Sequence, residues 1–349
     1  VINIMQRKPS IYIIASCILA IVAIASIQWG AVSISNQQML DAVTHYLQGK
    51  TPSSIYEGVF LQIRLPRVLL CALSGGILAI SGVYMQGLFR NPLVEPGIVG
   101  TSAGAAFGAS IVFVLAAYLP IEWKSLVGPL LVPLFAFIGA TFSTFLVYSI
   151  SKSQQKTSIL SILLVGLAIN ALGLSGMGFM TYLARDPQAR SINFWNLGTF
   201  SGANWQQVLI VSILFVVVFF STFQFAKPLN AILLGEEEAI YLGVDIKKFR
   251  RKILIVNTLM VAIITSFIGI IGFVGLIVPH IVRQIVGSDH KKLLPISMLV
   301  GGIVLLLADL AARLLLAPSE IPIGIITSLV GAPVFIILLK KQFFINSDA

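Results

Sequence analysis

Residues 205–224 read WQQVLIVSILFVVVFFSTFQ and carry no charged side chain. A helix of about 20 predominantly apolar residues is long enough to cross the hydrocarbon core of a bilayer. Other stretches of the chain share this character. We therefore predict an all-α, polytopic membrane helical bundle with ten transmembrane helices, at 11–32, 66–88, 94–117, 127–149, 158–183, 205–224, 253–269, 271–286, 294–315 and 322–340.

The composition excludes a soluble protein. Of the 349 residues, 57% are hydrophobic and 10% are charged, whereas a soluble domain carries roughly 25% charged residues. Too few charges are present to cover the chain in water, which excludes a soluble enzyme, a disordered scaffold and a disulfide-built secreted module. Cys17 and Cys71 lie in apolar stretches, so we expect them to pack as small apolar residues and to form no disulfide or metal site.

Three of the predicted spans admit another interpretation. The run 253–286 is one apolar stretch interrupted by three glycines, so it is either one overlong helix or two short ones. Two short helices place the basic residues near the C-terminus on the same side as Arg7 and Lys8. The first run follows Arg7 and Lys8 and resembles a secretory signal. We interpret it as a retained first span, with a cleaved signal as the alternative.

The net charge of +10 could indicate nucleic-acid binding, but most basic residues lie in short loops beside apolar spans, where they set orientation. With both termini on the inner side, sixteen of the 23 Lys and Arg residues fall inside and seven fall outside. This asymmetry obeys the positive-inside rule. It predicts cytoplasmic termini, a multi-pass membrane location and no nucleic-acid partner.

No segment outside the predicted spans exceeds about 33 residues, so we expect one transmembrane domain over 1–349 and no soluble catalytic domain. Gln48-Gly49-Lys50-Thr51 resembles the end of a phosphate-binding P-loop, but Thr44 stands where that motif requires glycine. We therefore expect a transport subunit without catalytic residues or a nucleotide site, in which any ATP hydrolysis belongs to a separate chain.

Glycines at helical spacing predict close helix packing. Small residues on one stripe let two helix backbones approach each other in lipid. Packing alone accounts for such stripes, and a role in transport is the alternative. The two sets, at four-residue and three-residue spacing, are Gly100, Gly104 and Gly108, and Gly269, Gly272 and Gly275.

Prolines near span ends predict broken or short helices and a compact bundle around a pathway. These prolines are Pro92, Pro96, Pro279, Pro322 and Pro333.

Membrane-embedded charge is sparse, but Asp309 and Arg313 lie four residues apart and are predicted to pair. Asp309 has almost no acidic company, which disfavours an ion-coupled secondary transporter or a membrane enzyme, although both remain alternatives. For His280 and His290 we expect packing or hydrogen-bonding roles and assign no metal site.

The segment 235–252 has the features of a docking surface on the cytoplasmic side. Three acids, Glu236 to Glu238, open a short predicted helix, where they suit its positive N-terminal end. Gly243 suits a helix stop. An apolar stripe of Ala239, Ile240 and Leu242 lies between them. A solvated connector with ordinary positive-inside charges is the alternative.

Motifs over about 60–340 resemble the FecCD-type permeases of iron-complex and cobalamin ABC importers. Their length and order make the resemblance specific. They comprise Arg64-Leu65-Pro66-Arg67, the stretch from Gln86 through Asn91-Pro92-Leu93-Val94-Glu95-Pro96-Gly97 to Gly108, Gly235 to Gly243, Gly272-Phe273-Val274-Gly275-Leu276-Ile277-Val278-Pro279-His280, Asp289-His290, Ala308-Asp309 to Arg313, Glu320-Ile321-Pro322-Ile323-Gly324 and Gly331-Ala332-Pro333.

The resemblance implies ten helices per subunit, a homodimer with one central translocation path, two ATP-binding cassette ATPase subunits that bind ATP and Mg, and an extracytoplasmic substrate-binding protein. It also implies a location in the cytoplasmic (inner) membrane of a bacterium. No cofactor is expected in this chain itself. The resemblance also assigns residues to three roles. These are ATPase coupling by Gly235, Glu236, Glu237, Glu238, Ala239, Ile240, Leu242 and Gly243, binding-protein docking by Arg64, Arg67 and Arg313, and a translocation path along Asn170, Ser175, Met177, Met180 and Thr181.

The residues themselves are compatible with the docking assignment. Arg64 and Arg67 flank a rigid Leu-Pro step at the predicted outer surface, where a guanidinium can hold a carboxylate bidentately. Interfacial anchoring of the helix is the alternative. Arg313 has a competing partner in Asp309, which weakens its docking assignment.

The substrate class is the least specific inference. The path residues are mostly apolar, which suits a large, partly apolar chelate. The segment Asp186 to Arg190, followed by Asn193-Phe194-Trp195, resembles the outer loop of haem permeases more than that of cobalamin permeases. We therefore expect haem (hemin) or a ferric siderophore, with cobalamin as the alternative.

Overall fold

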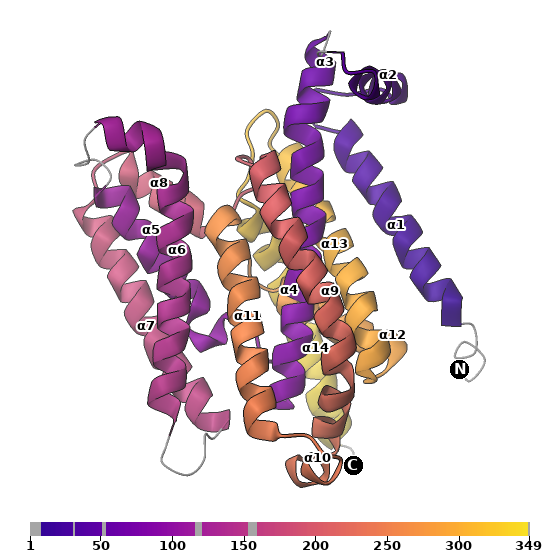
Figure 1. The fold of residues 1–349 in the computed structure, drawn as a ribbon, viewed down its shortest axis with the longest axis vertical. Helices are drawn as coiled ribbons and strands as arrows, with labels where there is room; N and C mark the ends of the chain where they lie inside the picture. The colour runs from indigo at the N-terminus through magenta and orange to yellow at the C-terminus, as the bar shows by residue number, and fades with distance from the viewer. Residues whose placement is uncertain (1–7, 31, 51–53, 116–120, 153–158, 348–349) are drawn as a thin grey trace. The chain divides into compact units, whose positions relative to one another are not determined.

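The computed structural model describes residues 8–30, 32–50, 54–115, 121–152 and 159–347, and these form helices and connecting segments without a β-strand (Figure 1). Arg7, Lys156 and Thr51, which entered the sequence predictions, lie outside the described residues. The helices are α1 (Lys8–Gln28), α2 (Asn36–Leu47), α3 (Ile55–Gly58), the π-helix η2 (Val59–Arg64), α4 (Leu65–Phe89), the 3-10 helix η3 (Pro96–Val99), α5 (Thr101–Leu115), α6 (Ile121–Ser151), α7 (Ile159–Leu183), α8 (Gln188–Asn196), α9 (Trp205–Leu234), α10 (Glu236–Tyr241), α11 (Ile246–Ile268), α12 (Val274–Val286), α13 (His290–Leu314) and α14 (Ile323–Ser347).

The predicted spans coincide with apolar helices. Within the described part of the chain, seven helices are long and apolar enough to cross a membrane, and three shorter apolar helices occupy Thr101–Leu115, Val274–Val286 and Ile323–Leu338. Each predicted span overlaps one of these helices. The all-α membrane fold is therefore confirmed.

The boundaries differ where backbone geometry overrides hydropathy. The span predicted from residue 94 begins as α5 only at Thr101, because the 3-10 helix η3 and Gly100, at φ +87°, precede it. In the run 253–286 the prediction of two helices is confirmed, since α11 ends at Ile268 and α12 starts at Val274. Pro279 lies inside α12 and Pro333 inside α14, so neither proline ends its helix.

The described chain divides into two compact units. One comprises residues 81–199 and 227–276. In it α5 packs against α6 and α7, whose ribbons lie beside it in Figure 1, and α11 packs against α6 and α5. A Cβ at Gly104 would collide with the Gly139 carbonyl of α6, and one at Gly108 with the Phe135 carbonyl. The predicted close packing is confirmed for Gly104 and Gly108, whereas Gly100 precedes the helix at positive φ.

The second predicted glycine stripe is wrong. Gly269, at φ +77°, caps α11 and lies against the Trp195 carbonyl, and Gly272 belongs to the non-helical break. Only Gly275 lies in a helix, where its carbonyl contacts Gly82 of α4. The three-residue spacing therefore marks a break between two helices here, because the first of these glycines adopts a backbone conformation that ends α11.

The other unit comprises residues 1–80, 200–226 and 277–349. In it α13 packs against α1 and α14. Gly75 of α4 and Gly301 of α13 approach so closely that a Cβ on either would collide with the other's carbonyl oxygen. This contact holds the first part of α4 against α13, and with it the arginines at the start of α4.

Candidate functional site

Arg64 ends the π-helix η2, and its guanidinium is enclosed by the chain that follows α1. Its Nη1 donates to the carbonyls of Ile27 (2.8 Å) and Trp29 (2.6 Å), and its Nη2 donates to that of Val32 (2.6 Å). The residue is 6% exposed. Gly30 lies directly against the guanidinium, where a Cβ would collide with it. Arg64 therefore fixes the turn after α1 through three carbonyl oxygens.

Asp309 of α13 joins two further arginines. The Nη2 of Arg67 lies 2.9 Å from its Oδ1, and the Nε of Arg313 lies 3.0 Å from its Oδ2. Arg67 also pairs with Glu320 at 2.8 Å. Arg313 in addition donates to the Ser26 and Trp29 carbonyls at 2.9 and 3.0 Å. The predicted pair of Asp309 with Arg313 is confirmed.

These residues form what we call the arginine cluster: Arg64, Arg67, Arg313, Asp309 and Glu320. The three arginines and Asp309 are buried, whereas the Glu320 side chain is 40% exposed. Two buried arginines share one buried carboxylate, and a buried charge of this kind is tolerated only when it is paired and hydrogen-bonded. The cluster links α4 to α13 and to the end of α1 within one unit. Each guanidinium predicted to dock a partner thus already has internal partners.

The residues that the resemblance assigns to ATPase coupling form the short helix α10 and its flanks, as the predicted helix requires. Gly235 precedes it, and Glu236, Glu237 and Glu238 occupy its first turn. Gly243, at φ +83°, follows the helix, and its N–H donates to the Ile240 carbonyl at 2.9 Å. The positive φ explains why glycine stands there. The predicted helix start and stop are both confirmed.

The apolar residues of α10 divide into one buried and three exposed side chains. Ala239 is fully buried within the chain, which corrects its assignment to the exposed stripe. Ile240 and Leu242 are exposed at 59% and 64%, and Tyr241, which the sequence analysis did not single out, at 90%. We call Ile240, Tyr241 and Leu242 the α10 apolar tip.

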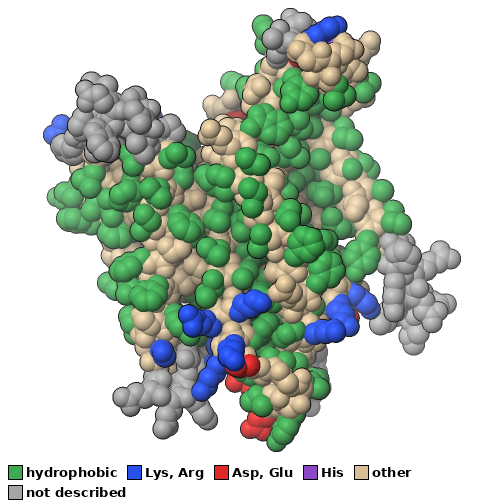
Figure 2. Space-filling view, viewed as in Figure 1, with side chains coloured by type: hydrophobic (Ala, Val, Ile, Leu, Met, Phe, Trp, Pro, Cys, Tyr) green, Lys and Arg blue, Asp and Glu red, His purple; other side chains and the backbone are tan. Residues whose placement is uncertain are grey.

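A salt bridge joins α10 to α11, and Asp245 caps the start of α11. The Nη2 of Arg250 lies 2.8 Å from Oε1 of Glu236. Asp245 caps α11, and the hydrogen bond from the backbone N–H of Lys248 (3.0 Å) lowers the pKa of the Asp245 carboxyl. Figure 2 shows Lys and Arg side chains gathered at the base of α11 above the acidic side chains of α10. The segment is therefore a structured element joined to α11.

The predicted path residues lie on α7, a helix with little burial inside the chain. Asn170 donates from Nδ2 to the Ile98 carbonyl (3.2 Å), and Thr181 to the Met177 carbonyl (2.9 Å). Ser175 is exposed, whereas Met177 and Met180 are half-buried. Only 11% of the apolar window of α7 is buried. A helix so exposed faces lipid or another polypeptide.

The histidines give no metal site in the described chain. His280 lies 3.2 Å from the Gln284 amide nitrogen, one turn along α12, and His290 is buried at the start of α13. Among the described residues, no three His, Cys, Asp or Glu side chains group as metal ligands do. Cys17 is exposed and Cys71 buried, and both are free.

The comparisons with known proteins agree with this architecture. Residues 18–341 match the FecCD transport family. The chain is 37% identical over 333 residues to the hemin transport system permease protein HmuU of Yersinia pestis, with 93% of each chain covered. It is 41% identical over 280 residues to the cobalamin import system permease protein BtuC of Halobacterium salinarum, covering 80% of this chain and 73% of the relative.

A solved structure described as an inward-facing metal-chelate type ABC transporter superposes with a TM-score of 0.82 at 32% identity, covering 96% of this chain and 100% of that chain. The family match extends over nearly the whole sequence, and the arginine cluster and α10 lie within it. The chain belongs to the FecCD transport family and is a permease subunit of an ABC importer.

Proposed function

We propose that this chain is the transmembrane permease of an ATP-driven, binding-protein-dependent importer of an iron complex, either haem or a ferric siderophore. The observation that carries the proposal is the family match over 18–341, together with a short helix, α10, that presents apolar side chains to a partner. The chain supplies the membrane path, while ATP and Mg are bound by a separate ATPase.

The proposed topology has ten membrane crossings with both termini in the cytoplasm. Seven long and three shorter apolar helices support the crossings. The excess of Lys and Arg in the loops assigned to the inner side supports the orientation. The proposed location is the inner membrane of a bacterium.

The proposed assembly contains two copies of the chain. The exposed surface of α7 supports it, since a second copy would cover a helix that this chain leaves largely bare. Ser175, Met177 and Met180 on α7 would then line a weakly polar path between the two copies, with Asn170 and Thr181 at other levels of the same helix. Such a lining suits a large chelate that must pass without strong binding.

Two ATPase subunits are proposed to dock on the assembly, one on the α10 helix of each copy of the chain. The α10 apolar tip has no cover within the described chain, and each larger apolar side chain that an ATPase buried would contribute roughly 1.5–3 kcal/mol. The acidic first turn and the Arg250–Glu236 pair hold the tip in one orientation relative to α11. A force applied at α10 would therefore reach the membrane helix α11.

A binding protein is proposed to dock at Arg64, Arg67 and Arg313, and the structure suggests that it does so by replacing one internal carboxylate. Glu320 is the exposed member of the arginine cluster. A carboxylate of the binding protein could take its place on Arg67 while Asp309 stays bound. Replacement of Glu320 by glutamine should then leave the fold intact and strengthen binding-protein association, which pull-down with the purified binding protein would measure.

Cobalamin is the second candidate substrate, because the chain is also close to cobalamin permeases such as that of H. salinarum. Uptake of labelled haem, ferric siderophore and cobalamin by a deletion strain carrying the gene separates the three. We expect uptake of haem or ferric siderophore. Uptake of cobalamin alone would change the proposed substrate to cobalamin and still support the proposed importer function. Uptake of none of the three would contradict the proposed importer function.

A further inference from the structure

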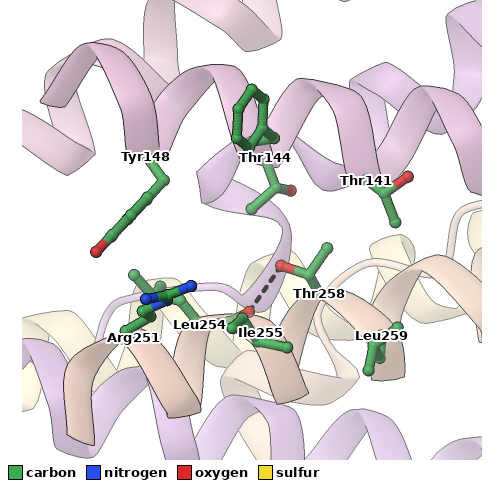
Figure 3. Close-up of a pocket in the computed structure, with 9 residues that line it drawn as sticks. Thr141, Thr144, Tyr148, Arg251, Leu254, Ile255, Thr258 and Leu259 are labelled. Carbon is green, nitrogen blue, oxygen red and sulfur yellow. Dashed lines mark hydrogen bonds between the residues drawn. The ribbon is translucent and has the colours of Figure 1, made fainter. Parts of the chain in front are cut away.

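A cavity of about 270 Å³ opens between α6 and α11, two helices of the same unit. In Figure 3 the upper helix contributes Thr141, Thr144 and Tyr148, and the lower helix contributes Arg251 and Thr258 among others. Both helices are long and apolar enough to cross a membrane, so a lipid of the bilayer is a possible occupant of a cavity between them. A molecule bound in this cavity must match both its apolar wall and the polar groups at one end.

The interior of this cavity is effectively apolar. Its three threonine hydroxyls each bond to the backbone carbonyl one turn earlier: Thr141 to Phe137 (2.8 Å), Thr144 to Ala140 (3.1 Å) and Thr258 to Leu254 (2.7 Å). The hydroxyl hydrogens of the three threonines are therefore already donated within their own helices, and Phe145, Leu254 and Leu259 complete the wall. A wall of this kind fits hydrocarbon.

One end of the cavity carries the opposite chemistry. Tyr148 and Arg251 lie together at one end in Figure 3, while Thr141 and Leu259 lie at the other. Among the described residues, neither the Arg251 guanidinium nor the Tyr148 hydroxyl has a hydrogen-bond or ion-pair partner. Arg251 is exposed and belongs to a basic run from Lys247 to Lys252, and Lys152 follows Tyr148 by four residues. This end therefore offers a cation and a hydroxyl to an anion.

We propose that this cavity binds an anionic phospholipid. Its phosphate accepts hydrogen bonds from Arg251 and Tyr148, and one acyl chain lies along the apolar wall between α6 and α11. Arginine binds phosphate through a planar fork of donors, and basic pockets between membrane helices bind anionic lipid headgroups. The lipid would bridge α6 to α11, the helix that continues from α10.

The headgroup end is tested with Arg251→Gln, and Lys247→Gln is its matched control, because Lys247 lies on the same helix and does not line the cavity. Native mass spectrometry of the delipidated full chain would give apparent Kd values for phosphatidylglycerol and phosphatidylcholine. We expect tighter binding of phosphatidylglycerol, about fivefold weaker binding in Arg251→Gln, from the usual contribution of one basic residue near an anionic headgroup, and no change in Lys247→Gln. Tyr148→Phe, which removes one hydroxyl, should weaken binding by a smaller factor.

The acyl-chain end is tested with Thr141→Trp, which fills the cavity far from Arg251, against Phe142→Trp on the same helix outside the cavity. Loss of phosphatidylglycerol only in Thr141→Trp supports the proposal. Three results would overturn it: equal weakening by Arg251→Gln and Lys247→Gln, equal binding of both lipids, or displacement of the lipid by inorganic phosphate alone. If Arg251→Gln fails to fold, Tyr148→Phe and Thr141→Trp still decide between these outcomes.

Discussion

The arginine cluster and α10 place charge and apolar surface in opposite ways. In the cluster, Arg64, Arg67 and Arg313 are each 6% exposed, and Asp309 is 1% exposed. In α10, Ile240 and Leu242 are mostly exposed and the acids of the first turn lie beside them. Charge is thus buried where helices meet inside the chain, and apolar side chains are exposed at the short helix α10.

This difference separates two kinds of function. A buried charge network with internal partners acts first on the chain's own structure, because its groups cannot be removed singly without leaving a charge unpaired. Exposed apolar side chains such as those of the α10 apolar tip are unfavourable in water, and a partner that covers them explains their presence. We therefore expect cluster substitutions to affect folding and α10 substitutions to affect assembly.

The largest effect is expected from Asp309→Asn. It removes the carboxylate charge that Arg67 and Arg313 share and should cost about 3–5 kcal/mol, the usual result of leaving a buried partner charge uncompensated. The measurement is the midpoint of thermal unfolding of the purified chain in detergent.

Glu320→Gln is the matched control for Asp309→Asn, because Glu320 pairs with the same Arg67 but is 40% exposed. An exposed pair contributes about 0–1 kcal/mol, so the midpoint should shift little. Equal shifts in the two variants would show that the cluster is not held together by the buried carboxylate.

A smaller effect is expected from Gly30→Ala. Its Cβ would collide with the Arg64 guanidinium, which three carbonyls hold in place. Overpacking of this kind costs typically about 1–3 kcal/mol. Gly202→Ala, where nothing lies within 4 Å of the new Cβ, is the control. If both variants unfold at the wild-type midpoint, Arg64 is free to move and its carbonyl contacts contribute little.

The smallest effect concerns the cap between α10 and α11. Because its folded-state pKa is lowered, the Asp245 carboxylate stabilises the first turn of α11 above its ordinary pKa, and this contribution is lost as the pH falls through the lowered value. Asp245→Ala should therefore speed amide exchange in the first turn of α11 at neutral pH and leave the rest of α11 unchanged. Unaltered exchange at Lys248 would mean that the cap is not formed in solution.

The sequence predicted the features that depend on local signals. The pair of Asp309 and Arg313 follows from four-residue spacing, and the bounds of α10 follow from the acids and glycines around it. The helix α2 was missed although its capping box, Ser35 with Gln38, is visible in the sequence. A search for caps outside the apolar runs would have found it.

Other features could not be predicted because they depend on packing between distant segments. Arg67 and Asp309 are 242 residues apart, so no spacing rule joins them, and the arginines could be expected only at the surface. The burial of Ala239 depends on which part of the chain lies against α10. Hydropathy placed the third span near α5 but did not show the 3-10 turn before it, since apolar character marks membrane depth and not backbone conformation.

The central claim is that the α10 apolar tip docks the ATPase, and Ile240→Asp and Leu242→Asp test it most directly. They replace the Ala239→Asp substitution that the sequence alone would suggest, since Ala239 is buried inside the chain. Gln206→Asp, which adds the same charge at an exposed position of α9 outside segment 235–252, is the control. The measurement is co-purification of the ATPase with the permease, with substrate uptake followed in parallel. We predict wild-type unfolding midpoints in all variants, with loss of the ATPase and of uptake only in Ile240→Asp and Leu242→Asp. A stable complex with normal uptake in both would contradict the account and leave α10 as a connector.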